Sequence, residues 1–469
     1  MHPAHAPSPD AKVSLPKRIG WGFGGLADNY IMNTVGTLVA PVYNIGLGMD
    51  PVGLGIALFI PRFIDAIADP VMGNISDNTR SRWGRRRPYI VIGAILCAIL
   101  LPLLWMPPLR SAAGMFWFFT IMSLIYSLAY TVFVVPYTAL GYEMTTDYDE
   151  RTRVLAWRMY IGLIGSMTLP WLYKLCLLPI FGGNAVVGAP WVCVGVGLLI
   201  VVSGILPAIV GRESAGAQVQ NKIHLGSALA STMRNKPFLM LLVTYLLIIC
   251  GIFTGLSLGL YVNIYLVCKG SKDFAATITG YSGTLQALTS YLSLPLIAAV
   301  STRWGKRHAM ITGLCFGAVG TASLWFTLTP EAPYLQLGSL FVAALGMQGC
   351  WLIVSSMVAD ICDEDELLTG LRREGIYSAV VSFVLKLGLA VSALTGGLVL
   401  KFSGYDAALA ETAGHVADGV LFNMKFLYIG LQCATMVAAA ALFLFYPISR
   451  ARSEETRRIL DERARAKLS

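Results

Sequence analysis

The sequence has few charged residues for its length. Of its 469 residues, 13% are charged and 56% are hydrophobic, whereas soluble domains carry about 25% charged residues. A soluble protein of this size needs more charge on its surface than the chain contains. The composition therefore excludes an ordinary soluble protein and favours a polytopic membrane protein.

Paired metal-binding and disulfide patterns are missing as well. The nine cysteines stand singly, most of them inside apolar runs, so neither a zinc site nor a disulfide framework is expected. The polar segments hold no nucleophile–base pair and no phosphate loop, which argues against an enzyme. We expect no cofactor. The segment 1–16 lacks the apolar core of a signal peptide, so no cleaved leader is expected.

Long apolar runs are what the chain has in quantity. A membrane-spanning helix needs about 20 apolar residues, and the sequence offers twelve such stretches. They are predicted at residues 19–45, 51–77, 89–107, 113–142, 153–179, 188–210, 237–267, 275–300, 307–329, 334–361, 374–401 and 420–447. The fold predicted is an all-α membrane protein with an N-terminal tail (1–18), a six-helix domain (19–210), a linker (211–236), a second six-helix domain (237–447) and a charged tail (448–469).

Basic residues alternate between the predicted loops. The net charge is +9, and clusters such as Arg80–Arg87 and Arg303–Arg307 follow even-numbered spans, whereas the opposite loops hold few. The positive-inside rule explains this pattern better than nucleic-acid binding does. We therefore predict a multi-pass protein of the plasma membrane, of the bacterial inner-membrane kind, with both termini cytoplasmic. Its partner is the lipid bilayer, and neither nucleic acid nor an obligate protein partner is expected.

One loop sequence occurs twice. Ser81-Arg-Trp-Gly-Arg-Arg86 follows the second span, and Ser301-Thr-Arg-Trp-Gly-Lys-Arg307 follows the eighth. The same loop recurs six spans later, as in transporters built from two parallel six-helix halves. The repeat predicts two related halves joined by the 211–236 linker.

Two carboxylates stand inside the second apolar span. Asp65 and Asp69 are four residues apart, and Arg62 precedes Asp65 by three, so all three share one helical face. Charges in a bilayer are costly and mark ion or substrate paths. Neighbouring carboxylates repel, so a proton or a metal ion is favoured between them. The alternative is a structural ion pair with Arg62 or with Lys386, which lies deep in the eleventh span.

The chain resembles the glycoside–pentoside–hexuronide:cation symporters of the major facilitator superfamily. The residues that carry the resemblance are Asp65–Gly73, Asn78–Gly84, Pro136-Tyr137, Asp149–Arg153, Trp157-Arg158, Trp351, Ala359–Asp363, Arg373–Tyr377 and Lys386. They extend over nearly the whole chain. The resemblance implies twelve helices in two pseudo-symmetric halves around a central cavity. It also implies cation-coupled symport, with H⁺ or Na⁺, of a sugar, glycoside or uronide by alternating access.

The resemblance also implies which residues hold the coupling ion. Asp65, Asp69 and Thr131 would bind it, with Na⁺ the one metal considered, and Lys386 would compensate the carboxylates when no ion is bound. Two positions depart from the family: Ala68 replaces a polar amide and Val134 replaces an aspartate. The first removes a ligand for Na⁺ and the second an acceptor for sugar hydroxyls. The departures favour H⁺ slightly. Thr131 is equally compatible with a hydroxyl bonded to its own helix.

Polar and aromatic residues of the spans are the candidates for substrate binding. Asn29 and Trp351 match family positions that contact sugar or line the cavity, and Arg158 belongs to a shared Trp-Arg pair. An indole stacks on sugar rings and a guanidinium bridges two hydroxyls or a carboxylate. The neighbours considered with them are Tyr126, Tyr137, Thr138 and Gln348. Ordinary helix packing is the alternative for each.

Charged residues at the predicted cytoplasmic ends are candidates for a gate made of ion pairs. They are Asp77, Arg82, Glu150, Arg151, Asp360, Asp363 and Arg373. Determinants of topology are the alternative, which accounts for the arginines but not for the acids. Three other functions remain open: an uncoupled facilitator, a lysolipid carrier of the same fold, and a membrane sensor that binds a sugar without moving it.

Overall fold

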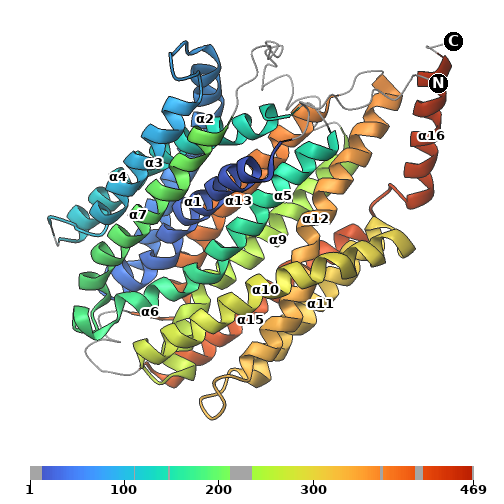
Figure 1. The fold of residues 1–469 in the computed structure, drawn as a ribbon. Helices are drawn as coiled ribbons and strands as arrows, with labels where there is room; N and C mark the ends of the chain where they lie inside the picture. The colour runs from blue at the N-terminus through green and yellow to red at the C-terminus, as the bar shows by residue number, and fades with distance from the viewer. Residues whose placement is uncertain are drawn as a thin grey trace. The chain divides into compact units, whose positions relative to one another are not determined.

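A computed structural model describes residues 13–109, 111–145, 148–211, 235–369, 373–406 and 416–466. Within these residues the regular structure is helical (Figure 1). The chain divides into two compact units, and each is considered by itself. The first unit holds the described residues up to Gly211, together with Lys272–Thr284 and Asp406, and the second unit holds the others.

The N-terminal part of the chain forms the helices of the first unit. They are α1 (Leu15–Val39), η2 (Ala40–Asn44), α2 (Pro51–Asn78), α3 (Arg87–Leu103), α4 (Ala112–Glu143), α5 (Tyr148–Thr168), η3 (Leu169–Trp171), α6 (Leu172–Cys176), η4 (Pro179–Phe181) and α7 (Ala185–Val210). In this unit α1 packs against α5 and α7, and α3 packs against α4 and α7.

The later helices belong to the second unit, apart from the beginning of α10. They are α9 (Lys236–Tyr261), η5 (Val262–Val267), α10 (Lys272–Trp304), α11 (Lys306–Thr327), α12 (Gln336–Thr369), α13 (Glu374–Phe402), α15 (Asp418–Phe443) and α16 (Arg450–Ala466). Here α9 packs against α13 and α15, α11 packs against α12 and α15, and α16 lies beside α12 (Figure 1).

The loop repeat in the sequence is accompanied by a repeat in helix packing. In each unit the first helix packs against the fifth and the sixth of its half, and the third packs against the fourth and the sixth. The first helix of each half, α1 or α9, also ends in a π-helical segment, η2 or η5. The two halves therefore share these four helix contacts as well as one loop sequence.

Each of the twelve predicted spans coincides with one helix or with two or three adjoining helices. Among the described residues, nine helices are long and apolar enough to cross a membrane; α1, α3 and α5 fall outside that set. Helix α3 has 17 residues, and α5 begins with the charged sequence around Glu150. The span predicted at 153–179 is divided into α5, η3 and α6, because Pro170 has no N–H to continue the α-helix.

Close backbone contact joins α11 to α12 in the second unit. A Cβ atom on Gly346 would lie 2.2 Å from the carbonyl oxygen of Gly313 and 2.5 Å from the nitrogen of Gly317. Both obstacles are backbone atoms of one helix, so they cannot rotate away as a side chain would. Glycine at position 346 is therefore a requirement of helix packing, as small residues are at many membrane helix interfaces.

We expect Gly346→Ala to lower the free energy of unfolding by about 1–3 kcal/mol, the usual cost of overpacking. The matched control is Gly338→Ala on the same helix, where a Cβ would meet no atom within 4 Å. That change should be neutral or stabilising by about 0.5–1 kcal/mol. Thermal unfolding of the purified variants measures both. Equal melting temperatures for the two variants would contradict the packing argument.

Candidate functional site

Asp65 and Asp69 meet a single hydroxyl group. The Oγ1 atom of Thr131, on α4, lies 2.6 Å from Oδ1 of Asp65 and 3.3 Å from Oδ1 of Asp69, both on α2. Asp65 is 1% exposed and Thr131 is 2% exposed. Because a hydroxyl has one hydrogen to donate, Thr131 donates a well-formed hydrogen bond to one of the two carboxylates at a time. Three of the predicted ion-site residues are thus brought together within the first unit.

Local sequence explains how α2 carries these carboxylates. The helix begins at Pro51, and its N-cap residue Asp50 accepts a hydrogen bond from the Gly53 nitrogen at 2.8 Å. Pro70, directly after Asp69, has no N–H to donate to the carbonyl of Ala66, four residues earlier. A backbone carbonyl released from the helix ladder therefore lies between the two aspartates in the sequence. Carbonyl and carboxylate oxygens are the ligands that hard cations prefer.

Arg62 and Tyr126 connect the ion-site helices to α1. Nη2 of Arg62 donates to the carbonyl of Met32 at 3.1 Å, and the hydroxyl of Tyr126 donates to the carbonyl of Ile31 at 3.0 Å. These bonds satisfy α1 backbone oxygens from α2 and α4. Tyr126, predicted to be near substrate, instead lies 5% exposed in the helix interface.

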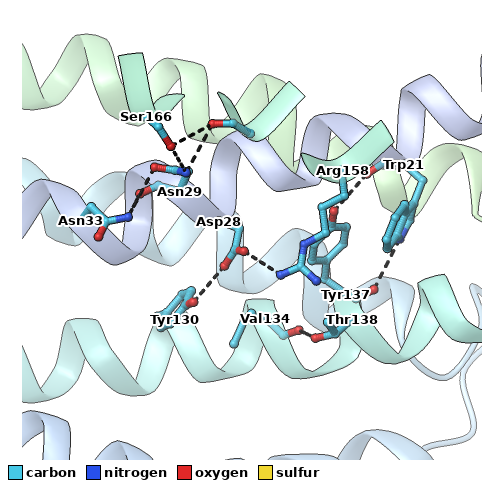
Figure 2. Close-up of polar contacts among 11 residues, drawn as sticks. Trp21, Asp28, Asn29, Asn33, Tyr130, Val134, Tyr137, Thr138, Arg158 and Ser166 are labelled. Carbon is cyan, nitrogen blue, oxygen red and sulfur yellow. Dashed lines mark hydrogen bonds and ion pairs between the residues drawn. The ribbon is translucent and has the colours of Figure 1, made fainter. Parts of the chain in front are cut away.

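A second polar cluster centres on Asp28, which the sequence analysis did not select (Figure 2). Its Oδ2 atom pairs with Nη2 of Arg158 on α5 at 2.8 Å, and its Oδ1 atom accepts from the Tyr130 hydroxyl on α4 at 2.8 Å. The Arg158 guanidinium also lies over the ring of Tyr137, 5.3 Å from the centroid. The predicted residues Arg158 and Tyr137 are therefore neighbours, joined by one carboxylate.

Asp28 and Tyr130 carried a signal that was available in the sequence. Asp28 is an acidic residue inside the first apolar span, which is the same argument that selected Asp65 and Asp69. The structure also shows a different carboxylate near Val134, the position at which the family has an aspartate. Asp28, on α1, places a carboxylate beside Tyr130, one helical turn before Val134 on α4 (Figure 2).

The other predicted substrate residues of the first unit are engaged within the helix bundle. The Asn29 amide nitrogen donates to Ser166 Oγ at 2.9 Å and to the Gly162 carbonyl at 3.3 Å, both on α5. The Thr138 hydroxyl donates to the carbonyl of Val134 in its own helix. Asn29 therefore joins α1 to α5, and Thr138 makes the local backbone bond common for threonine in helices.

The predicted residues of the second unit are spread over two helices. Trp351, on α12, packs edge-on against Tyr245 of α9, with ring centroids 5.5 Å apart. Lys386 is half-buried near the middle of α13. The Gln348 side chain lies outside the described residues. Trp351 shares an apolar cluster with its neighbours, and its role toward substrate stays a prediction.

At the polar end of the first unit, charged residues form ion pairs between helices. Asp77, at the end of α2, pairs with Arg86 at 2.6 Å, and Arg86 also reaches Glu143 of α4 at 3.0 Å. Glu150, 2% exposed, pairs with Arg18 of α1 at 2.6 Å. Arg82 instead stacks on Trp83, and the side chain of Arg151 is outside the described residues. The paired acids predicted here are thus interhelical.

The polar end of the second unit is held by α16. Asp360 pairs with Lys306 at 2.7 Å and accepts from Ser453 at 3.0 Å, while Asp363 pairs with Arg457 at 3.3 Å. Arg373 pairs with Asp365 at 2.6 Å, and this hydrogen bond raises the pKa of Arg373 above its usual value. The predicted charged tail forms the helix α16, which contacts acids that were predicted to belong to the gate.

The geometry favours binding and movement of ions over chemistry on a substrate. Within the described residues no three His, Cys, Asp or Glu side chains gather as a metal cluster. The carboxylates of Asp65 and Asp69 both lie within 3.3 Å of Thr131 Oγ1, and two carboxylates that share a site repel each other. A proton or a monovalent cation relieves that repulsion, and an ion held by two carboxylates and one hydroxyl can still leave.

Comparison with known proteins supports a transport function. Residues 20–450 match the family described as MFS/sugar transport protein. The chain belongs to that family. It is therefore a multi-pass membrane transporter of the major facilitator fold and not an enzyme, as the sequence predicted.

Individual relatives of this transporter extend over nearly its whole length. The inner membrane symporter YicJ of Escherichia coli is 30% identical, over 92% of this chain and 91% of its own. The isoprimeverose transporter of Lactiplantibacillus pentosus is 24% identical, over 93% and 90%. The solved D-xylose-proton symporter shares the fold with a TM-score of 0.60 at 15% identity, over 93% and 98%. The two curated relatives support the predicted glycoside–pentoside–hexuronide:cation symporter group, and the solved structure supports the fold.

Proposed function

We propose that this transporter couples the movement of H⁺ or Na⁺ to uptake of a sugar or glycoside by alternating access. One observation carries the proposal. Tyr130 and Thr131 are consecutive on α4; the first bonds to Asp28 and the second to Asp65 and Asp69. A shift of α4 therefore acts on both polar clusters together. Coupling between two ligands requires such an element with different contacts in its two positions.

The ion belongs at Asp65, Asp69 and Thr131. Binding there neutralises carboxylates whose mutual repulsion otherwise strains the contact between α2 and α4. H⁺ needs one basic oxygen, whereas Na⁺ needs several oxygen ligands. The carbonyl of Ala66, which Pro70 leaves without its helical donor, offers one such ligand and offsets the loss of a polar side chain at Ala68. Both ions are thus chemically compatible with the site.

The substrate belongs at Asp28, Arg158 and Tyr130. Asp28 accepts and Arg158 donates hydrogen bonds, whereas the Tyr137 ring is fully buried, stacks on Trp21 and Phe133, and supports the Arg158 guanidinium. The charges of Asp28 and Arg158 already balance within their ion pair. A neutral polyhydroxylated substrate keeps that balance, whereas the carboxylate of a uronide must compete with Asp28 for the guanidinium. We therefore favour a neutral sugar or glycoside over a uronide.

The remaining assignments complete the proposal. Lys386 compensates the carboxylates when the ion is absent, and the ion pairs at the polar ends close the cytoplasmic side in one of the two states. Two six-helix domains at 19–210 and 237–447 rock about the sites. Both termini lie in the cytoplasm, as the distribution of basic loop residues indicates.

Uptake into proteoliposomes tests the coupling directly. We expect accumulation of a neutral sugar from a panel when an inward H⁺ or Na⁺ gradient is imposed, and none when both gradients are dissipated by ionophores. A panel of matched sugars and uronides also tests the preference for neutral substrates. Uptake that proceeds equally with and without either gradient would indicate an uncoupled facilitator.

A further inference from the structure

The two copies of the repeated sequence share a glycine with positive φ. The φ angles of Gly84 and Gly305 are +102° and +86°, which glycine adopts without strain. The tryptophan before each glycine points outward: Trp83 is 65% exposed and Trp304 is 63% exposed. Each loop therefore displays an indole at the polar end of its unit.

A basic residue after each glycine binds the end of the last span of its half. Nη2 of Arg87 donates to the carbonyl of Gly211, the C-cap residue of α7. In the second unit, Nη2 of Arg307 donates to the carbonyl of Leu444, the C-cap residue of α15. Cationic side chains are favourable at helix C-termini. The two loops therefore occupy equivalent places, between the third and sixth helices of each half.

The loops differ in what lies over them. In the second unit, Arg450 at the start of α16 donates to the carbonyls of Thr302 and Arg303. In the first unit, the equivalent loop borders a pocket of about 640 Å³ between the start of α3 and the end of α7. Its lining residues are Arg82, Trp83, Gly84, Arg87, Pro88, Val91, Ala208 and Ile209.

The pocket has a cationic rim and an apolar wall. Arg82 is exposed and lies over the Trp83 ring, 5.5 Å from its centroid. Arg87 adds a second guanidinium at the N-terminus of α3, where the helix dipole is positive. Val91 and Ile209 form the apolar side, and Ile209 is 67% exposed. Guanidinium groups and a helix N-terminus together are suited to a phosphate group.

We propose that this pocket binds the phosphodiester headgroup of an anionic membrane lipid. The outer faces of α3 and α7 continue the apolar wall away from the pocket. Exposed side chains there include Ile92 and Ile99 on α3 and Leu198 and Val202 on α7. A lipid placed with its phosphate at Arg82 and Arg87 lays its acyl chains along this surface. Basic pockets between membrane helices and indoles at the bilayer interface are typical of such binding.

Trp83 provides the probe. The full-length transporter is reconstituted in phosphatidylcholine nanodiscs that contain increasing fractions of phosphatidylglycerol brominated near the headgroup. Quenching assigned to Trp83 is the difference between the wild type and Trp83→Phe, since the chain has ten tryptophans. We expect this quenching to saturate at a low fraction of the anionic lipid, and brominated phosphatidylcholine at the same fractions to quench little.

Arg82→Gln tests the site with little risk to folding, because Arg82 is exposed. We expect the half-saturating lipid fraction to rise about fivefold, the contribution of one basic residue near an anionic lipid. The matched control is Arg303→Gln, read through the quenching assigned to Trp304 by the difference between the wild type and Trp304→Phe. Because Arg450 already binds the carbonyls of Thr302 and Arg303 beside Trp304, this quenching should show no saturable preference for phosphatidylglycerol in the wild type or in Arg303→Gln.

Three results would overturn the assignment. Equal responses of Trp83 and Trp304 would mean diffuse attraction between positive loops and an anionic surface. If soluble glycerophosphoglycerol, at the same concentration as the brominated phosphatidylglycerol, abolished the quenching of Trp83, the pocket would be assigned to a soluble phosphate compound. Shielding of Trp83 from iodide in detergent alone would mean that another part of the chain fills the pocket.

Discussion

Asp65→Asn should abolish gradient-driven accumulation of substrate while the protein still inserts in the membrane. Asp65 is 1% exposed and shares Thr131 with Asp69. Asparagine keeps the shape and loses the charge that holds the ion. We expect accumulation to fall about 100-fold or more. The bound ion loses one of its two carboxylates, and removing one partner of a buried pair of opposite charges costs about 3–5 kcal/mol. Asp69→Asn should act in the same direction. Proteoliposome uptake under an imposed gradient measures the effect.

Exchange of labelled for unlabelled substrate separates the two coupling ions. Asparagine imitates a protonated carboxylate, so in an H⁺-coupled transporter Asp65→Asn should lose accumulation and keep exchange. With Na⁺ coupling both should be lost, since an amide cannot replace the anionic ligand. Asp50→Asn is the matched control on the same helix, because Asn caps helices as well as Asp does. Normal accumulation by Asp65→Asn would show that the coupling ion does not bind at Asp65.

Asp28→Asn should have the second largest effect. Asp28 holds Arg158 at 2.8 Å and accepts from Tyr130 at 2.8 Å. We expect uptake at low substrate concentration to fall about 30-fold or more, the effect of about 2 kcal/mol or more on a hydrogen-bonded charge pair. Thermal stability should also fall, because Arg158 loses its carboxylate. The measurements are uptake kinetics and the melting temperature.

A double variant separates the substrate role from the structural one. Asp28→Asn combined with Arg158→Gln leaves no unbalanced charge, so stability should return toward that of the wild type. Uptake should remain lost, because neutral amides replace the charged carboxylate and the planar guanidinium, whose hydrogen bonds to substrate hydroxyls are stronger. Wild-type uptake in the stable double variant would show that the ion pair is only structural. Arg158→Lys keeps the charge but not the planar fork, and an intermediate loss is expected.

The sequence was sufficient for the parts of the fold set by apolar length. Each predicted span is helical, and the doubled Arg-Trp-Gly loop indicated the repeat that helix packing shows. The division of span five at Pro170 was missed because the apolar run continues across it, although proline is a known helix breaker. The early start of α5 was missed because residues around Glu150 are polar, so hydropathy gives no signal there.

The sequence predicted the candidate site best where its residues are close together in the chain. It predicted the site less well where a contact joins two helices that are far apart in the sequence. Thr131 on α4 contacts both Asp65 and Asp69, which share one turn of α2, and their role as an ion site stays a prediction. Tyr126 and Asn29 have residue types suited to substrate, yet their polar atoms bond to other helices. Sequence alone does not say which face of a helix a polar group uses. Asp28 shows the converse, because its importance rests on Arg158, 130 positions away.

The adjacency of Tyr130 and Thr131 has a consequence for equilibrium measurements. If α4 transmits free energy between the clusters, the transmission must be reciprocal. The factor by which the ion tightens substrate binding must equal the factor by which substrate tightens ion binding. A typical coupling of about 1–3 kcal/mol corresponds to factors of about 5–150. Titrations of each ligand with and without the other should therefore give the same coupling factor. Replacing Thr131 by valine should reduce both measured factors by the same amount.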